Sequence, residues 1–337
     1  MKPIYKIFAT IILLILVNSV KSQDIHFTKF YDAPLILNPA NTGNYEGNWR
    51  LLNNYRQQGD QVMPYYTTTT IALDHPIYIK SEKASIGFTF IHDNSSVYSF
   101  FSNKIYFSSA YFVKTTANSY LHMGLQAGYV FKNVNNNKLS FPDQFDRSIG
   151  AFNPNMHTNE TMQKQFANYL DLSWGLIYSY VLEKCKIEMG VAMFHYNKPI
   201  ESFLNEKNRL SPKYSSHVYY QQKLANNYYL KPIMLFAMQN RASELLSGVK
   251  AGLKTNSKTF KDINIGLLYR GGFLRTQDAV ITQAGFDFKN YTISVAYDIN
   301  IMSKKELSYS GNAFEISLTF NRPSTDLGVH KIKCDIF

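Results

Sequence analysis

The eight histidines are candidates for metal chemistry, but their spacing argues against it. They stand at positions 26, 75, 92, 122, 157, 195, 217 and 330, and no two lie three to five residues apart. Histidines that bind zinc from one helix or strand usually have that spacing. The sequence therefore predicts no metal site.

Patterns of catalytic residues are also missing from the chain. The segment from His92 to Ser96 has the residue types of a hydrolase triad, but adjacency in sequence does not produce triad geometry, and this composition is typical of a turn. No glycine-rich phosphate loop, paired-cysteine motif or Gly-x-Ser-x-Gly elbow occurs. We expect a protein with no catalytic residue and no cofactor. An outer-membrane hydrolase is a third hypothesis. It requires a serine, a histidine and an acid from distant segments to meet near the rim of the barrel.

Two cysteines, Cys185 and Cys334, permit one disulfide in an exported protein. They lie far apart in the sequence, so only the fold decides whether they meet. Cys185 follows a short connection and Cys334 lies in the C-terminal tail, and we expect both on the periplasmic side. A disulfide that ties down the tail is an open possibility.

The N-terminus has the features of a secretory signal peptide. A basic segment, Met1 to Lys6, precedes the apolar run Ile7 to Val17, and small side chains stand before Gln23. The apolar run is roughly half of the ~20 residues that a helix needs to cross a bilayer, which argues against a membrane anchor. We predict that residues 1–22 are removed and that the protein is exported.

The chain is basic, with a formal net charge of +11. It stays basic without its signal peptide. A basic chain often binds nucleic acid, but here the lysines and arginines are spread through turns and loops, and export takes the protein out of the cytoplasm. Anionic outer-membrane lipid or an acidic partner fits the charge better, and we expect no nucleic acid.

From residue 48 onward, the chain repeats segments of about ten residues in which apolar and polar residues alternate. In Tyr291 to Ile299, the odd-numbered residues are apolar or aromatic, and the even-numbered ones are small or polar. A strand with lipid on one side and a polar lumen on the other needs this alternation. The 25 Tyr and 24 Phe fit an aromatic outer face.

Fourteen such segments can be counted, and their connections alternate in length. The segments are 48–55, 65–74, 84–92, 103–113, 121–131, 170–180, 185–195, 213–224, 228–238, 243–253, 262–270, 280–288, 291–299 and 314–321. Outer-membrane barrels have short periplasmic turns and longer extracellular loops, and the longest connections here are 132–167, 196–212 and 300–312. These features predict an all-β fold, a transmembrane antiparallel outer-membrane β-barrel of about 14 strands. A secreted β-sandwich is the alternative, because the sequence does not show which face points inward.

We expect the barrel to span residues 48–321 and two segments to lie outside it. Residues 23–47, with a cluster of turn-forming residues from Leu37 to Gly43, are predicted to form a periplasmic N-terminal segment. Residues 322–337 are predicted to form a periplasmic C-terminal tail. The inward positions of the strands carry charged residues that would line either a solute path or an ordinary polar lumen; they are Asp171, Glu188, Arg270, Asp287, Asp298 and Glu315.

The mature N-terminus carries the strongest likeness to a known family. The residues concerned are Gln23-Asp24, Phe27, Phe30-Tyr31, Pro34-Leu35, Leu37-Asn38-Pro39-Ala40 and Gly43. Further matches are Tyr55-Arg56, Phe141 to Asp146, Gly190-Val191-Ala192, His195, Pro199, Leu210-Ser211-Pro212, Pro232, Tyr269-Arg270, Asp278-Ala279, Tyr297-Asp298, Glu315 to Leu318 and Cys334. Across the mature chain, the protein resembles the PorP/SprF outer-membrane proteins of the type IX secretion system of Bacteroidota. It departs from that pattern after Arg56, where no tryptophan follows, and at Tyr196, where leucine is common.

The resemblance implies a non-enzymatic barrel that helps type IX cargo, including gliding adhesins with a C-terminal signal domain, to reach or stay on the cell surface. Expected partners are the secreted cargo or adhesin, other type IX components and outer-membrane lipid. We expect the long loops to bind the cargo, because rigid scaffolds place recognition on loops. The candidate contact residues are Phe141, Pro142, Asp143, Phe145, Asp146, Pro199 and Phe203. A transport barrel for a small or lipophilic solute is the alternative function.

Overall fold

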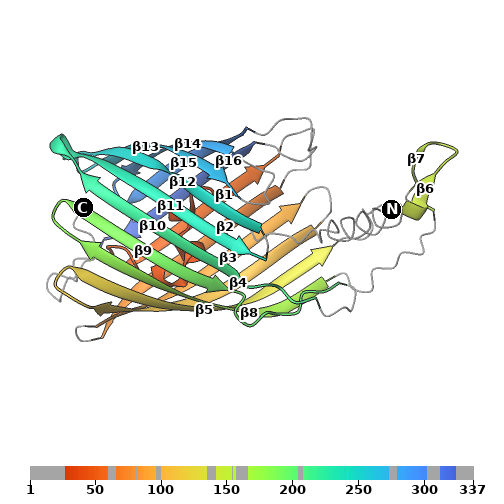
Figure 1. The fold of residues 1–337 in the computed structure, drawn as a ribbon, viewed down its shortest axis with the longest axis horizontal. Helices are drawn as coiled ribbons and strands as arrows, with labels where there is room; N and C mark the ends of the chain where they lie inside the picture. The colour runs from red at the N-terminus through yellow and green to blue at the C-terminus, as the bar shows by residue number, and fades with distance from the viewer. Residues whose placement is uncertain are drawn as a thin grey trace, which may run out of the picture.

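The computed structural model shows a closed antiparallel β-barrel (Figure 1). It describes residues 27–59, 66–79, 82–95, 100–134, 142–153, 155–156, 166–203, 208–240, 242–272, 279–301 and 312–323. No helix within these ranges is both long enough and apolar enough to span a membrane.

Fourteen of the described strands form the barrel, which confirms the predicted fold class and strand number. They are β1 (Trp49–Gln58), β2 (Tyr66–Ile79), β3 (Glu82–Ser95), β4 (Phe100–Lys114), β5 (Ser119–Val134), β8 (Phe166–Val181), β9 (Cys185–Phe194), β10 (Lys213–Lys223), β11 (Tyr228–Gln239), β12 (Ala242–Lys254), β13 (Phe260–Gly271), β14 (Ala279–Phe288), β15 (Tyr291–Asn300) and β16 (Ala313–Arg322). Each barrel strand pairs with its neighbours along the chain, and β1 closes the barrel on β16, from Trp49 opposite Arg322 to Gln58 opposite Ala313. Closure leaves no unpaired strand edge.

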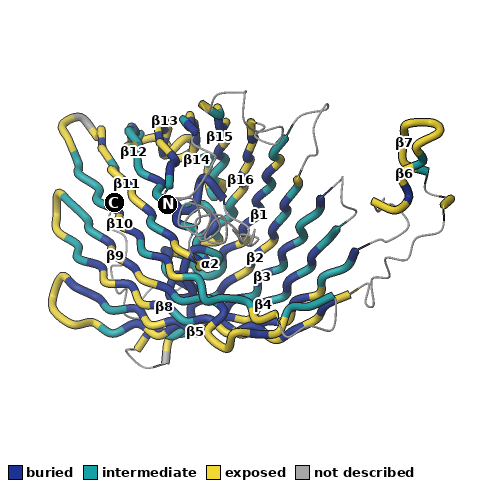
Figure 2. Tube along the Cα trace, turned by 45° about the vertical axis from the view of Figure 1, so that its right-hand side comes forward, coloured by how far each residue is buried: buried dark blue, intermediate teal, exposed yellow. Residues whose placement is uncertain are grey.

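The exposure of the side chains decides between a barrel and a sandwich. In β15, Tyr297 is 45% exposed whereas the neighbouring Asp298 is 1% exposed. The same alternation runs around the barrel, with exposed residues on its outside (Figure 2). Apolar side chains therefore face outward, toward lipid, and polar ones face the lumen, as a membrane barrel requires and a sandwich excludes.

The two ends of the barrel differ in their connections. At one end, here called the long-connection end, the long connections 135–165, 195–212 and 301–312 join the ends of neighbouring strands. At the other, the short-turn end, lie turns such as 182–184, 224–227 and 289–290. The connection from β5 to β8 carries a small hairpin, formed by β6 (Phe145–Asp146) and β7 (Ala151–Phe152) after the short helix η4 (Pro142–Gln144). This hairpin lies well beyond the barrel strands (Figure 1).

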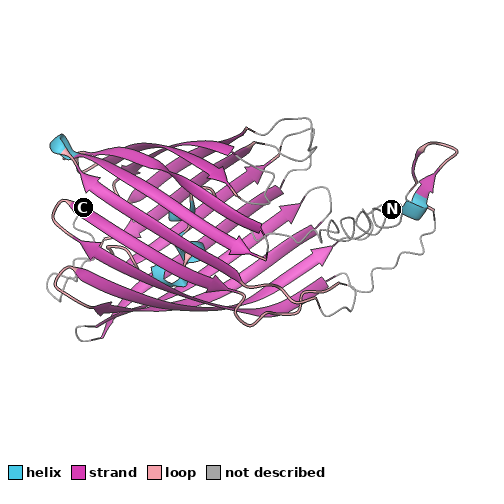
Figure 3. Ribbon diagram, in the orientation of Figure 1, coloured by secondary structure: helices cyan, strands magenta, loops and turns pink. Residues whose placement is uncertain are grey.

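The prediction that residues 23–47 lie outside the barrel is wrong for the described part, residues 27–47. This part, here called the lumen segment, lies inside the barrel as three short helical turns, η1 (Phe30–Asp32), α2 (Pro34–Leu37) and η2 (Pro39–Asn41) (Figures 2 and 3). Its polar groups bond to inward-facing strand residues, and its apolar groups fill a gap that the strand side chains leave. Residues 23–26 and 324–337 lie outside the described residues, and their periplasmic location stays a prediction.

Candidate functional site

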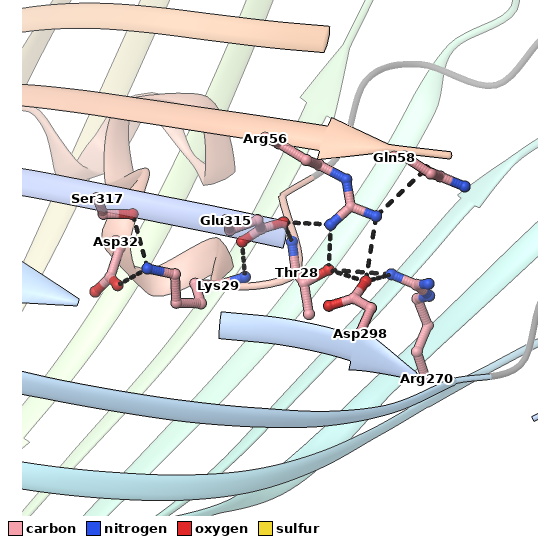
Figure 4. A network of polar contacts seen from close by, with 9 residues as sticks. All are labelled: Thr28, Lys29, Asp32, Arg56, Gln58, Arg270, Asp298, Glu315 and Ser317. Atoms are coloured by element: carbon pink, nitrogen blue, oxygen red, sulfur yellow. Dashed lines mark hydrogen bonds and ion pairs between the residues drawn. The ribbon is translucent and has the colours of Figure 1, made fainter. Parts of the chain in front are cut away.

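One end of the lumen segment is held by a buried carboxylate at the long-connection end. The backbone N–H groups of Thr28 and Lys29 donate to the two oxygens of Glu315 at 2.6 and 3.0 Å. The Thr28 hydroxyl donates to Asp298 Oδ2 at 2.8 Å. Both acids lie near the strand ends that border connection 301–312. The described part of the lumen segment therefore begins at this end, and Figure 4 shows the contacts that hold it.

Two arginines balance the two carboxylates. Arg56 of β1 pairs with Glu315 and also with Asp298 at 3.2 Å. Arg270 of β13 pairs with Asp298 at 2.6 Å and donates to Thr28 Oγ1 at 3.0 Å. All four charged side chains are at most 4% exposed. Removing one partner of a buried pair typically costs about 3–5 kcal/mol, because the other charge is left uncompensated.

Lys29 anchors the next part of the segment. Its ammonium donates to the carbonyl and hydroxyl of Ser294 at 2.9 and 2.7 Å and to the hydroxyl of Ser317 at 3.0 Å. The Asp32 carboxylate lies 3.4 Å away. A fully buried lysine is tolerated only when its charge is paired and its donors are satisfied, and here both conditions are met.

Apolar residues of the segment pack against apolar residues on the inner wall. The Phe30 ring stacks on Tyr219 with centroids 5.9 Å apart. Around it lies a buried cluster on β11 to β15 that includes Ile233, Leu235, Leu246, Leu268, Ile281 and Ala296. The inner wall of a water-filled barrel is normally polar. Apolar residues at inward positions therefore indicate, from the sequence, that another part of the protein packs against this wall.

A tight turn of the segment sits on two wall glycines. The Asn38 amide donates to the carbonyls of Leu176 and Val191 at 3.2 and 3.0 Å. A Cβ on Gly124 would lie 2.2 Å from the backbone nitrogen of Ala40, and one on Gly175 would lie 1.9 Å from Asn38 Oδ1. Gly124 thus allows the two backbones to approach closely, and Gly175 leaves room for the Asn38 side chain.

The segment leaves the lumen at the short-turn end. The Gly43 N–H donates to Asp74 Oδ2 at 2.7 Å, and Gly43 has a φ of +70°, which favours glycine. Arg50 holds the same carboxylate with two bonds at 3.0 and 2.8 Å. From Thr28 to Gly43, the segment thus runs the length of the lumen and bonds to strands on opposite sides of the barrel.

The predicted cargo-contact residues fall into separate groups. Pro142, Asp143, Phe145 and Asp146 lie together in the projecting hairpin, whereas Pro199 and Phe203 lie in the connection after β9. Phe203 packs against Phe100, with ring centroids 6.4 Å apart. Phe141 lies outside the described residues.

The hairpin displays aromatic residues that the sequence reading only partly identified. Phe145 packs edge-on against Phe152 with centroids 5.2 Å apart, and the two side chains remain 41% and 52% exposed. Ile149 at the tip is 63% exposed. The hydroxyl and backbone N–H of Ser148 donate to Asp146 and lower the pKa of that carboxyl.

The connection after β9 is bound to the rim of the barrel. His195, with a φ of +57°, places Nδ1 2.9 Å from Asp171 Oδ1, and the Tyr106 hydroxyl donates to Asp171 Oδ2 at 2.9 Å. The Asn197 side chain bonds to the backbone of Leu170 at 2.7 Å. These contacts hold the base of the connection in one conformation.

Two other sequence predictions concern cysteine and metal. Cys185 opens β9 and is half-buried, but Cys334 lies outside the described residues, so the disulfide stays a prediction. Among the residues with described positions, no three His, Cys, Asp or Glu side chains come close enough to hold a metal ion.

The comparison with known families decides the identity. The model of the type IX secretion system membrane protein PorP/SprF matches residues 19–320. The chain belongs to the PorP/SprF family. As a PorP/SprF protein, it is a membrane β-barrel of the type IX secretion system, and the predicted resemblance is confirmed. No curated protein matches the chain significantly.

Solved structures similar to this PorP/SprF protein share its fold at low sequence identity. The toluene transporter TbuX of Ralstonia pickettii has a TM-score of 0.52 and 10% identity, over 86% of this chain and 94% of that one. The monoaromatic hydrocarbon channel CymD has a TM-score of 0.51 and 12% identity, over 88% and 94%. At this identity, the likeness shows the barrel fold alone.

Proposed function

We propose that this PorP/SprF protein supports the secretion or surface attachment of specific type IX cargo by binding the cargo's C-terminal signal domain at the long-connection end. The observation that carries the proposal is the pair of exposed aromatic residues on a hairpin that projects beyond a barrel whose lumen is occupied. The proposed cargo includes gliding adhesins, and the other type IX components would bind elsewhere on the barrel.

The occupied lumen favours a supporting role over passage of the cargo through this barrel. The lumen segment is bonded to the wall at both ends, through Glu315 at one and Asp74 at the other. Opening the lumen would break these buried charge pairs without forming new ones, so it would cost free energy. A barrel closed in this way is a rigid platform, and rigid platforms place recognition on the loops they carry.

The hairpin has the chemistry of a protein-binding surface. Aromatic side chains carry much of the binding energy in protein interfaces, and Phe145 and Phe152 are held against each other before any partner arrives. Preorganised contacts lose less entropy on binding. The exposed apolar residues of this hairpin therefore offer a partner a surface that it could bury.

The double variant Phe145→Ser/Phe152→Ser is expected to lose cargo binding by about tenfold or more, because interface aromatic residues are often worth more than 1.4 kcal/mol. Co-purification of cargo with the tagged barrel from native outer membranes measures this. The matched control is Tyr228→Ser, which removes another exposed aromatic residue, 52% exposed, from the start of β11 at the short-turn end. Equal cargo recovery from the double variant and the wild type would refute the role of the hairpin.

A transport barrel is the second candidate, favoured by the apolar cluster on the inner wall and by the fold shared with hydrocarbon channels. The lumen segment argues against it, because the segment covers that cluster. Uptake of a radiolabelled hydrocarbon such as toluene into vesicles separates the two functions. Uptake by the wild type that exceeds that of empty vesicles would favour transport, and none would favour the secretion role.

A further inference from the structure

Two lysines face each other on the inner wall, and neither forms an ion pair with a carboxylate in the described part of the chain. Lys231 of β11 is the direct cross-strand partner of Lys250 of β12. Both are half-buried, so solvent in the lumen reaches them. Like charges placed directly opposite each other on neighbouring strands destabilise a sheet. The arrangement persists only if something offsets the repulsion.

Aromatic rings fix the two ammonium groups but do not neutralise them. Lys231 Nζ lies 4.9 Å from the centre of the Tyr219 ring, and Lys250 Nζ lies 5.3 Å from the centre of the Tyr31 ring. Both rings pack on Phe30 of the lumen segment. A cation above a ring gains about 0.5–2 kcal/mol and keeps its full charge.

The neighbouring carboxylates are engaged elsewhere. Glu188 attracts Lys231, but it is bound by Lys186 at 3.6 Å. Asp32 also attracts Lys231, but it is held by Lys29 at 3.4 Å and by the Ser294 hydroxyl.

The other charges near the pair act on it without a direct ion pair. Asp287 of β14 attracts Lys250 and is hydrogen-bonded by Thr292. Lys186 of β9 repels Lys231. Within the described chain, neither Lys231 nor Lys250 forms an ion pair, so neither ammonium group is directly neutralised.

We propose that Lys231 and Lys250 form a binding site for a dianionic oxyanion, a phosphate group, inside the short-turn end of the lumen. A phosphate carries about −1.5 to −2 charges at pH 7, which matches the two lysines, and it has oxygens for donors on both sides. Lysine binds phosphate as a point charge and needs no fork geometry. The site is distinct from the cargo-binding hairpin, which lies beyond the opposite end of the barrel.

Access to the site comes from the short-turn end. Lys231 is the fourth residue of β11, and Lys250 lies four residues before the end of β12. The ligand would touch two wall lysines that contact the Phe30 and Tyr31 part of the lumen segment through Tyr219 and Tyr31. Binding there would hold that part of the segment against the wall.

The test measures the thermal unfolding midpoint of the full-length mature barrel in phosphatidylcholine vesicles. Inorganic phosphate is compared with sodium chloride at equal ionic strength. At about five times its Kd, phosphate is expected to raise the midpoint by roughly 2–4 °C. Lys231→Met and Lys250→Met should abolish this rise. Lys213→Met is the matched control, because Lys213 also lies over a ring, 5.7 Å from Phe194, but near the long-connection end; it should keep the rise.

A second arm separates free phosphate from a lipid headgroup. Without inorganic phosphate, vesicles that contain phosphatidic acid are compared with phosphatidylcholine alone. A rise only in this arm, lost in Lys231→Met, assigns the site to a lipid phosphate. A rise only in the first arm assigns it to free phosphate.

Two results would overturn the proposal. One is a wild type whose unfolding midpoint does not rise in either arm. The other is a rise that both Lys231→Met and Lys250→Met retain.

Discussion

Replacing Glu315 with glutamine is expected to lower the free energy of unfolding by about 3–5 kcal/mol. The substitution keeps the shape of the side chain but removes the charge that pairs with Arg56 and one of the two acceptors for the N–H groups of Thr28 and Lys29. Arg56 would then be buried with Asp298 as its remaining acid, and Arg270 competes for that acid. Urea unfolding in lipid vesicles, followed by the fluorescence of the two tryptophans, measures the loss.

The double variant Glu315→Gln/Arg56→Met tests whether the loss of stability comes from the unpaired charge of Arg56. It removes one charge of each sign, so Asp298 and Arg270 stay as a balanced pair, and most of the lost stability should return. The control is Glu82→Gln, because Glu82 accepts a bond from Tyr111 at 2.8 Å on the exposed side of the barrel. It should change stability by less than about 0.5 kcal/mol. If Glu315→Gln behaves like Glu82→Gln, the buried network does not anchor the segment.

Replacing Gly124 with alanine is expected to displace the lumen segment and open the barrel to ions. The new Cβ would lie 2.2 Å from Ala40 N and 2.3 Å from Pro39 C. These are backbone atoms, so no side-chain rotation relieves the clash, and overpacking of this kind costs typically about 1–3 kcal/mol. Single-channel conductance in a planar bilayer should rise from the closed level of the wild type to steady open-channel currents.

The matched control for this experiment is Gly285→Ala. Gly285 also faces the lumen, but an added Cβ would meet only strand side chains, at 3.0 Å from Asn264 Oδ1 and 3.2 Å from Ser294 Cβ. It should leave the lumen segment in place and the barrel closed. A closed Gly124→Ala barrel of unchanged stability would contradict the close contact between the turn and the wall.

The barrel was predictable from the sequence because its physics is local. In a strand, successive side chains point to opposite faces. Because one face contacts lipid and the other faces the polar lumen, apolar and polar residues alternate along each segment. Fourteen segments carried that pattern, and every one became a strand. The bounds were less certain: β2 continues to Ile79 and β3 begins at Glu82, because cross-strand bonds extend the pairing beyond the alternating residues.

The lumen segment was missed because its structure depends on contacts that are distant in sequence. Thr28 bonds to Glu315 and Asp298, more than 240 residues away, and no periodicity within residues 27–47 reports those partners. Two signals did exist on the wall. Inward positions of β11 and β12 carry Ile233, Leu235 and Leu246 where a polar lumen needs none, and inward Gly124 and Gly175 leave room for a turn.

The sequence by itself therefore determined the class of the molecule: a membrane barrel, about fourteen strands, long connections at one end, and the family. Each of these follows from patterns within ten residues or from motifs along the chain. Only the tertiary structure decided that the family's N-terminal motif lies inside the barrel, that Arg56, Arg270, Asp298 and Glu315 hold it there, and that Phe145 and Phe152 meet on a projecting hairpin. The reason is that charge pairs, backbone close approaches and ring contacts are set by closure of the sheet, which brings residues together across the whole length of the chain.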